Sequence, residues 1–112
     1  MAFLFMEIKT TKAVEEFITS LEKFTIAKVL RVIDLLEKFG NQLKLPHSKS
    51  LGKGLFEGLF ELRIRGNKEI RIFYAYHSNK VILLHGFIKK SQQIPQKEIS
   101  IANSRLKDLG LG

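Results

Sequence analysis

The chain lacks cysteine altogether, which excludes disulfide bonds, thiolate zinc sites and cysteine nucleophiles from its 112 residues. It also lacks an apolar run long enough to cross a membrane, because the apolar segment 1–8 is too short for a span or a signal-peptide core. Linkers rich in Pro, Gly and Ser are absent too. We therefore expect a single cytoplasmic domain, 1–112, with segment 1–8 forming its first β-strand.

Acidic residues are scarce in one part of the chain. The formal net charge is +8, yet residues 62–93 hold seven Lys or Arg and Glu69 as their sole acid, a balance of +6. Residues 1–61, with nine basic and eight acidic side chains, and residues 94–112, with three and two, carry +1 each. Positive charge concentrated in this way is typical of a face that binds a polyanion. The alternative is a basic surface that serves only solubility.

Apolar residues at helical spacing predict two antiparallel helices in the first third of the chain. The first lies within residues 10–21 and the second within residues 23–39. Thr10 or Thr11 is available to cap the first helix, and Gly40 is expected to stop the second.

Strand signals take over later, after a stretch, 40–58, that we expect to be loop. Alternating polarity predicts strands within residues 59–65, 69–77 and 80–90, joined by hairpin turns at "GNK" and "SN". A closing helix is expected to start at Pro95. The order predicts an α+β domain with helices packed on a small antiparallel sheet.

The register of the first hairpin follows from matching polarity. We expect a three-residue loop, 66–68, because it sets residues of like character opposite each other: Leu62 with Ile72, Ile64 with Ile70, and Arg63 with Arg71. A two-residue loop would mix apolar and charged residues on each face. In the last strand, regular pairing puts His85, Phe87 and Lys89 on one side, and a bulge at Gly86 would change that parity.

The leading cluster of candidate functional residues lies on these strands and comprises Arg63, Arg65, Arg71, Tyr74, His85, Lys89 and Lys90. Two arginines directly opposite each other repel unless an anion bridges them. We expect that anion to be a phosphate, which guanidinium groups bind in bidentate fashion. Aromatic side chains nearby either stack on RNA bases or belong to the core: Phe73, Tyr74, Tyr76 and Phe87.

Other chemistry finds less support. His85 is a candidate general base, because positive charge from Lys89 lowers its pKa, although a hydrogen-bonded structural role is the alternative. Lys49 and Lys53 are expected either to add phosphate contacts or to lie in a solvated loop. The other two histidines are expected at the surface, and three scattered histidines predict neither a metal site nor a cofactor. Acidic residues lie mostly on the helices, with no sign of a paired-carboxylate site.

Four segments carry a resemblance to a known family: "GLFELRI", "EIRIFY", "ILLHGFIKKSQQIPQKEI" and "IANSR". Together they resemble the phage Gp49-like, or HigB, branch of the RelE/ParE toxin superfamily, and "VEEFITSL" and "VIDLLEKFG" extend the likeness over nearly the whole chain. One departure is the tandem repeat of "GLFE" at 54–57 and 58–61, where the family pattern has one copy. The repeat lengthens either the loop or the strand.

The resemblance implies a RelE-like fold and a toxin of a type II toxin–antitoxin module. It implies a metal-independent endoribonuclease that cleaves mRNA on the ribosome by attack of a ribose 2′-oxygen on the adjacent phosphate. Arg71 would then stabilise the transition state, Arg63 would orient the phosphate, and Lys89 or Lys90 would protonate the leaving oxygen. His85 or Tyr74 would be the base. The implied partner is a cognate antitoxin, typically a HigA-like helix-turn-helix protein.

Two alternatives remain open from the sequence. A ParE-like member of the superfamily would share the fold and poison DNA gyrase. A basic RNA- or ribosome-binding module would bind without catalysis. For the nuclease itself, the residues expected to bind RNA are Arg65, Lys49, Lys53, Phe73 and Phe87. Whether an antitoxin covers the basic face or docks elsewhere is also left open.

Overall fold

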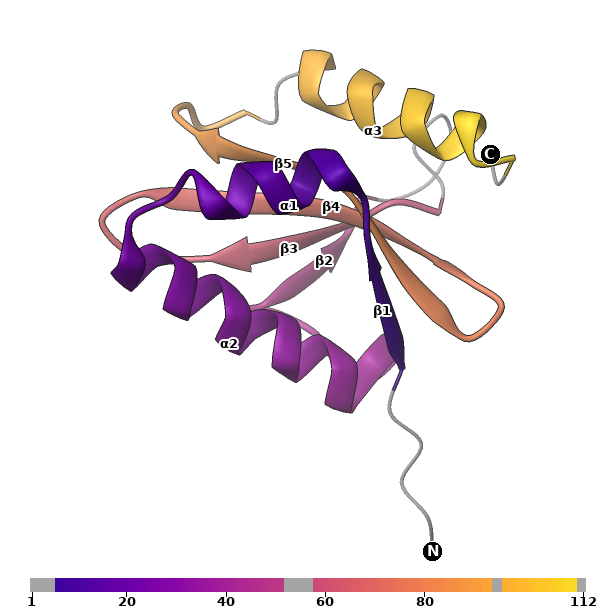
Figure 1. The fold of residues 1–112 in the computed structure, drawn as a ribbon, viewed down its shortest axis with the longest axis horizontal. Coiled ribbons are helices and arrows are strands. Elements are labelled where there is room, and N and C mark those ends of the chain that lie inside the picture. The colour runs from indigo at the N-terminus through magenta and orange to yellow at the C-terminus, as the bar shows by residue number, and fades with distance from the viewer. Residues whose placement is uncertain (1–5, 52–57, 94–95, 111–112) are drawn as a thin grey trace, which may run out of the picture.

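The computed structural model describes residues 6–51, 58–93 and 96–110, which form a five-stranded mixed sheet with helices on both faces (Figure 1). In chain order the elements are β1 Glu7–Thr10, α1 Lys12–Thr19, α2 Lys23–Phe39, the 3-10 helix η1 Gly40–Gln42, β2 Ser48–Ser50, β3 Phe60–Ile64, β4 Glu69–His77, β5 Lys80–Lys89 and α3 Gln96–Asp108. The strand order is β1-β5-β4-β3-β2; β1 runs parallel to β5 and the other pairs are antiparallel. The predicted α+β class is confirmed.

The predicted ends of the first two helices are also confirmed. Thr11 is the N-cap of α1, and its side-chain oxygen accepts a hydrogen bond from the Val14 amide at 3.4 Å. Gly40 ends α2 with φ of 52°, a conformation that glycine adopts without the steric cost of a side chain.

The stretch expected to be loop contains a strand. Strand β2 pairs with β3 and completes the edge of the sheet, with Ser48 opposite Leu62 and Lys49 opposite Glu61. Its sequence, Ser-Lys-Ser, has little strand propensity, so pairing with β3 rather than local preference produces it. The first tandem "GLFE" lies outside the described residues, as do Lys53, Pro95 and residues 1–5 of the predicted first strand.

Strands β4 and β5 are apolar on both faces because helices cover both. One core lies between the sheet and the pair α1 and α2, and includes Ile70, Ile72 and Tyr74 of β4. The other lies between the sheet and α3, and includes Phe73 and Ala75 of β4. Alternate residues of a strand point to opposite faces, so each residue of β4 belongs to a known side of the sheet.

The predicted register of the first hairpin is confirmed: Leu62 pairs with Ile72, Ile64 with Ile70, and Arg63 with Arg71. The second hairpin turns at Ser78 and Asn79, whose φ angles of 49° and 63° are those of a type I′ turn. Both hairpins therefore form where the sequence predicted them.

The sequence suggested a bulge at Gly86; strand β5 does contain a bulge, but two positions earlier, at Leu84. Phe73 pairs with His85, but the next residue, Tyr74, pairs with Leu83, so Leu84 is the extra residue. A bulge changes which face the following side chains occupy. Leu84 and His85 consequently both face α3, and the residues beyond them at odd positions, Phe87 and Lys89, lie on the same face as Arg71.

Gly86 has a different function, which is to let α1 approach the sheet. A β-carbon at this position would lie 2.4 Å from Cδ2 of Phe17. We expect Gly86→Ala to lower the free energy of unfolding by about 1–3 kcal/mol, the usual cost of overfilling a packed core, as measured by urea denaturation. Gly66→Ala is the matched control, because its β-carbon would meet only the flexible end of Lys28, at 2.8 Å from Nζ. Equal midpoints for the two variants would contradict this account of Gly86.

Candidate functional site

A basic cleft lies where β3 ends, β4 begins and β5 ends. These three ends meet because adjacent strands are antiparallel. The cleft has a volume of about 520 Å³, and its lining residues are Arg63, Arg65, Glu69, Arg71, Lys89, Lys90, Ser91 and Gln92. Five cationic side chains and one carboxylate therefore share one hollow, which we call the basic cleft. This arrangement favours an anionic ligand.

A buried carboxylate bridges the two opposed arginines. Oε1 of Glu61 accepts a hydrogen bond from Nε of Arg63 at 2.7 Å and lies 3.5 Å from Nε of Arg71. Glu61 is fully buried and Arg71 is 4% exposed. The bridging anion that the sequence led us to expect as a phosphate is thus supplied by the protein itself, so the opposed arginines are not in themselves a sign of a ligand.

Arg71 is also held from its other side. Its Nη1 donates to Oε2 of Glu69 at 3.0 Å and to the Ile70 carbonyl oxygen at 3.2 Å. Within the described part of the chain, Oε2 of Glu61 and Nε of Arg71 are buried without a hydrogen-bond partner. A guanidinium fixed in this way can present its remaining N–H groups to the cleft in one orientation, which is the preorganisation that electrostatic stabilisation requires.

The two acidic residues of this cluster were missed by the sequence reasoning, which placed carboxylates mainly on helices. The signal was present in the sequence: residues two apart on a strand share a face, so Glu61 lies beside Arg63, and Glu69 beside Arg71. Ser91 and Gln92 were missed because they follow the strand and have no periodic pattern.

Tyr74 lies on the opposite face of the sheet from Arg71. It is fully buried in the core beneath α1 and α2, and its hydroxyl is hydrogen-bonded to the hydroxyl of Ser48. Burial raises the pKa of Tyr74 above its usual 10, and hydrogen bonds to Ser48 and Tyr76 oppose the shift. A buried phenol behind the sheet has no access to a ligand in the basic cleft.

His85 faces α3 and has both ring nitrogens engaged. Nε2 lies 3.3 Å from each carboxylate oxygen of Glu98, and Nδ1 lies 3.1 Å from Nη1 of Arg105. Arginine can only donate, so Nδ1 accepts and Nε2 carries the proton that Glu98 accepts. Arg105 also donates to the Leu84 carbonyl oxygen at 2.8 Å. His85 therefore ties α3 to the bulge in β5 and does not line the basic cleft.

Acid is expected to weaken this connection. Burial, the largest influence, lowers the pKa of His85 below 6.5, Glu98 opposes the shift and Arg105 adds to it. The unfolded chain binds a proton near pH 6.5 that the folded chain binds only at lower pH. The free energy of unfolding should therefore fall as the pH drops through 6.5 toward the folded pKa. Urea denaturation over this range should show a smaller fall for His85→Gln. His77→Gln, at an exposed position, should behave like the parent protein, and identical curves for all three would contradict the prediction.

Of the described residues predicted to contact RNA, one lies in the basic cleft and three lie elsewhere. Arg65 is exposed in the basic cleft. Phe73 and Phe87 are buried against α3, with ring centroids 5.2 Å apart, so they do not offer a stacking surface. Lys49 is exposed on β2 and does not line the cleft.

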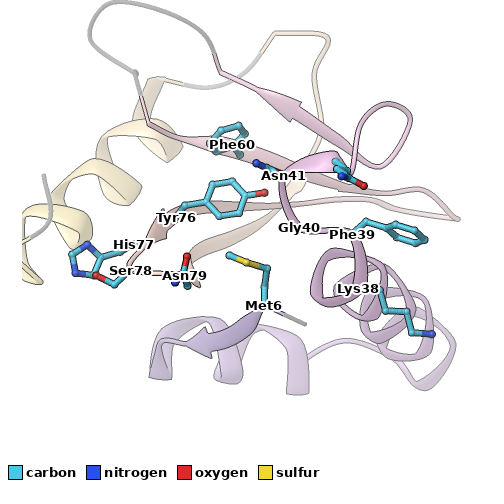
Figure 2. A pocket seen from close by; sticks show the side chains of 11 residues that line it. Met6, Lys38, Phe39, Gly40, Asn41, Phe60, Tyr76, His77, Ser78 and Asn79 are labelled. Atoms are coloured by element: carbon cyan, nitrogen blue, oxygen red, sulfur yellow. The ribbon is translucent and has the colours of Figure 1, made fainter. Parts of the chain in front are cut away.

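A second hollow lies at the far end of the sheet (Figure 2). It has a volume of about 650 Å³ and is lined by Met6, Lys38, Phe39, Gly40, Asn41, Gln42, Phe60, Tyr76, His77, Ser78 and Asn79. Strand β4 begins at the basic cleft and ends here, which separates the two hollows by the length of the strand. The second hollow is larger but contains a single lysine, so the positive charge belongs to the basic cleft.

Two further observations concern the described residues only. Residues 6–51, 58–93 and 96–110 contain no group of three His, Asp or Glu side chains placed to hold a metal ion. None of the helices in the same ranges is long and apolar enough to span a membrane.

Comparison with known proteins gives one match. A family model described as phage derived protein Gp49-like (DUF891) matches residues 16–107, which include all the residues that line the basic cleft. No curated protein and no solved structure matches the chain.

Proposed function

This chain belongs to the phage-derived Gp49-like family, a RelE/HigB-like toxin family, and we propose that it is an endoribonuclease that cleaves mRNA on the ribosome. Membership of a toxin family implies an antitoxin partner in general. The finer proposals are that the antitoxin is a HigA-like helix-turn-helix protein and that the toxin acts in the cytoplasm, where its substrate is. A helix-turn-helix protein encoded beside this chain and copurifying with it would support the first of these.

The observation that carries the proposal is the basic cleft. Five cationic side chains line it, and one of them, Arg71, is buried and held on two sides. An exposed arginine would suffice for loose attraction to RNA. A buried, oriented guanidinium is suited to a single phosphate at a defined position, because bidentate hydrogen bonding requires a fixed plane.

The proposed reaction is an internal transfer at phosphorus. The ribose 2′-oxygen forms a bond to the adjacent phosphorus, and the bond from phosphorus to the 5′-oxygen breaks. Arg71 and Arg63 stabilise the negative charge that develops on the phosphoryl oxygens. Lys89 or Lys90 gives a proton to the departing 5′-oxygen, which leaves a 2′,3′-cyclic phosphate and a free 5′-hydroxyl.

The proton of the 2′-hydroxyl passes to water in this proposal. His85 is committed to Glu98 and Arg105, and Tyr74 lies on the other face of the sheet, so neither is placed to accept it. Charge stabilisation by the cationic residues is therefore the main contribution of the protein. Pairs of donors aimed at developing charge can supply much of a rate enhancement.

The test is to incubate the purified protein with programmed ribosomes and map the new 5′ ends in the mRNA. Ribosome-dependent cleavage that yields new 5′-hydroxyl ends is the expected result. Intact mRNA together with inhibition of DNA gyrase would overturn the proposal in favour of a gyrase poison. Ribosome binding without cleavage would overturn it in favour of a non-catalytic module.

A further inference from the structure

Arg71 contacts two carboxylates that differ in exposure. The side chain of Glu61 is 0% exposed, whereas that of Glu69 is 42% exposed. Glu61 is enclosed by protein and cannot leave. Glu69 lies on the wall of the basic cleft with its Oε2 3.0 Å from Nη1 of Arg71, and it is the single acidic residue among those described that line the cleft.

The position of Glu69 conflicts with anion binding. An RNA phosphate that approaches Arg71 meets a carboxylate that already occupies one of its N–H groups, and two anions in hydrogen-bond range repel each other. The Glu69 end of this ion pair is 42% exposed, so its carboxylate can turn into water while Glu61 and the Ile70 carbonyl oxygen continue to hold the guanidinium of Arg71. The sheet offers it a second cation, because Lys89 lies directly opposite Glu69 on β5.

We propose that Glu69 is an internal competitor that occupies the phosphate position of Arg71 in the free protein and is displaced when an RNA phosphate binds. The inference rests on the proposed function, because it assigns the cleft to a phosphodiester. Its consequence is selectivity: loosely held polyanions must compete with the carboxylate, whereas a phosphate delivered in the correct geometry displaces it. Glu69 is thus a specificity-determining residue of the basic cleft.

Glu69→Gln tests the proposal, because the amide keeps the shape of the side chain and removes its charge. We would measure binding of a fluorescent single-stranded RNA whose 2′-hydroxyls are methylated, so that it cannot be cleaved. The variant should bind about fivefold more tightly, the factor expected for removing one like charge at this distance in largely aqueous surroundings. The gain should shrink as salt is raised.

Glu7→Gln is the matched control. It changes the net charge by the same amount and removes an exposed carboxylate that is ion-paired with Lys9 at 3.0 Å, but β1 pairs with β5 at Lys80, the end opposite Lys89. Its affinity for the RNA should stay within about twofold of the parent protein, since distant exposed charges are screened. A second comparison adds Arg71→Lys to Glu69→Gln, and should remove most of the gain if it depends on Arg71.

The outcomes separate this inference from the proposed function. Equal affinities for Glu69→Gln and Glu7→Gln would overturn the role of Glu69, and so would weaker binding by Glu69→Gln, while cleavage of mRNA by the parent protein would leave the proposed function standing. If the parent protein and the Glu69→Gln variant both fail to bind the RNA at low salt, the role of Glu69 is overturned, and cleavage of mRNA on programmed ribosomes decides the proposed function separately.

Discussion

Replacing Arg71 by lysine is expected to reduce mRNA cleavage by about 100-fold or more, the loss typical when one oriented donor to a developing oxyanion is removed. Lysine keeps a positive charge near Glu61, so the buried carboxylate retains a counterion. It loses the planar fork that binds two phosphoryl oxygens at once. Single-turnover cleavage on programmed ribosomes measures the change, with urea denaturation of the same preparation as the check on folding.

Arg65→Lys is the matched control for this experiment. Arg65 lines the same cleft but is exposed, and the same substitution there should change the cleavage rate by less than about fivefold. Arg71→Ala is less informative than its lysine counterpart, because it also removes a counterion of the buried Glu61. Cleavage by Arg71→Lys at the rate of the parent protein would show that the phosphate does not need this guanidinium.

Replacing Glu61 by alanine is expected to cost about 3–5 kcal/mol of the free energy of unfolding, the range found when one partner of a buried ion pair is removed. Arg71 would remain 4% exposed, directly opposite Arg63, with no carboxylate between the two guanidinium groups. Urea denaturation measures the loss. Glu7→Ala, which removes an exposed ion pair, should cost less than about 1 kcal/mol.

Adding inorganic phosphate to the Glu61→Ala variant tests whether the two arginines can bind a phosphate in place of the missing carboxylate. If the opposed arginines need an anion, phosphate in the buffer should recover part of the stability that Glu61→Ala loses, because a ligand that binds only the folded state stabilises it by mass action. The same phosphate should have a smaller effect on the stability of Glu7→Ala. A Glu61→Ala variant as stable as Glu7→Ala would contradict the role we assign to Glu61 as the internal counterion.

The features that the sequence predicted best are those set by local chemistry or by matched polarity. Thr11 and Gly40 end helices for reasons that lie within one turn of the chain. The hairpin of β3 and β4 has one register that pairs Ile64 with Ile70 on one face and Arg63 with Arg71 on the other. The resemblance to the toxin family covers the same helices and strands. The family model matches residues 16–107, which leaves out Thr11 and the first residues of α1.

The features that were missed depend on partners distant in the chain. Strand β2 exists because β3 offers it an open edge, and its three polar residues carry no strand signal of their own. Tyr74 was grouped with Arg71 on chemistry alone, although three positions along an unbroken strand place two side chains on opposite faces. The sequence suggests His85 as a base, but it does not reveal Glu98 and Arg105, which reach the imidazole only because α3 packs on the sheet.

The extra residue at Leu84 shifts the alternation of side chains along β5 by one position. Everything after it is out of phase with everything before it, so Lys89 reaches the solvent side of the cleft instead of pressing its ammonium group toward α1 and α2. Deletion of this one residue would leave the rest of the sequence unchanged, yet it would move every side chain at the end of β5 to the opposite face of the sheet. The chemistry of this end of the molecule thus depends on the number of residues in a strand as much as on which residues they are.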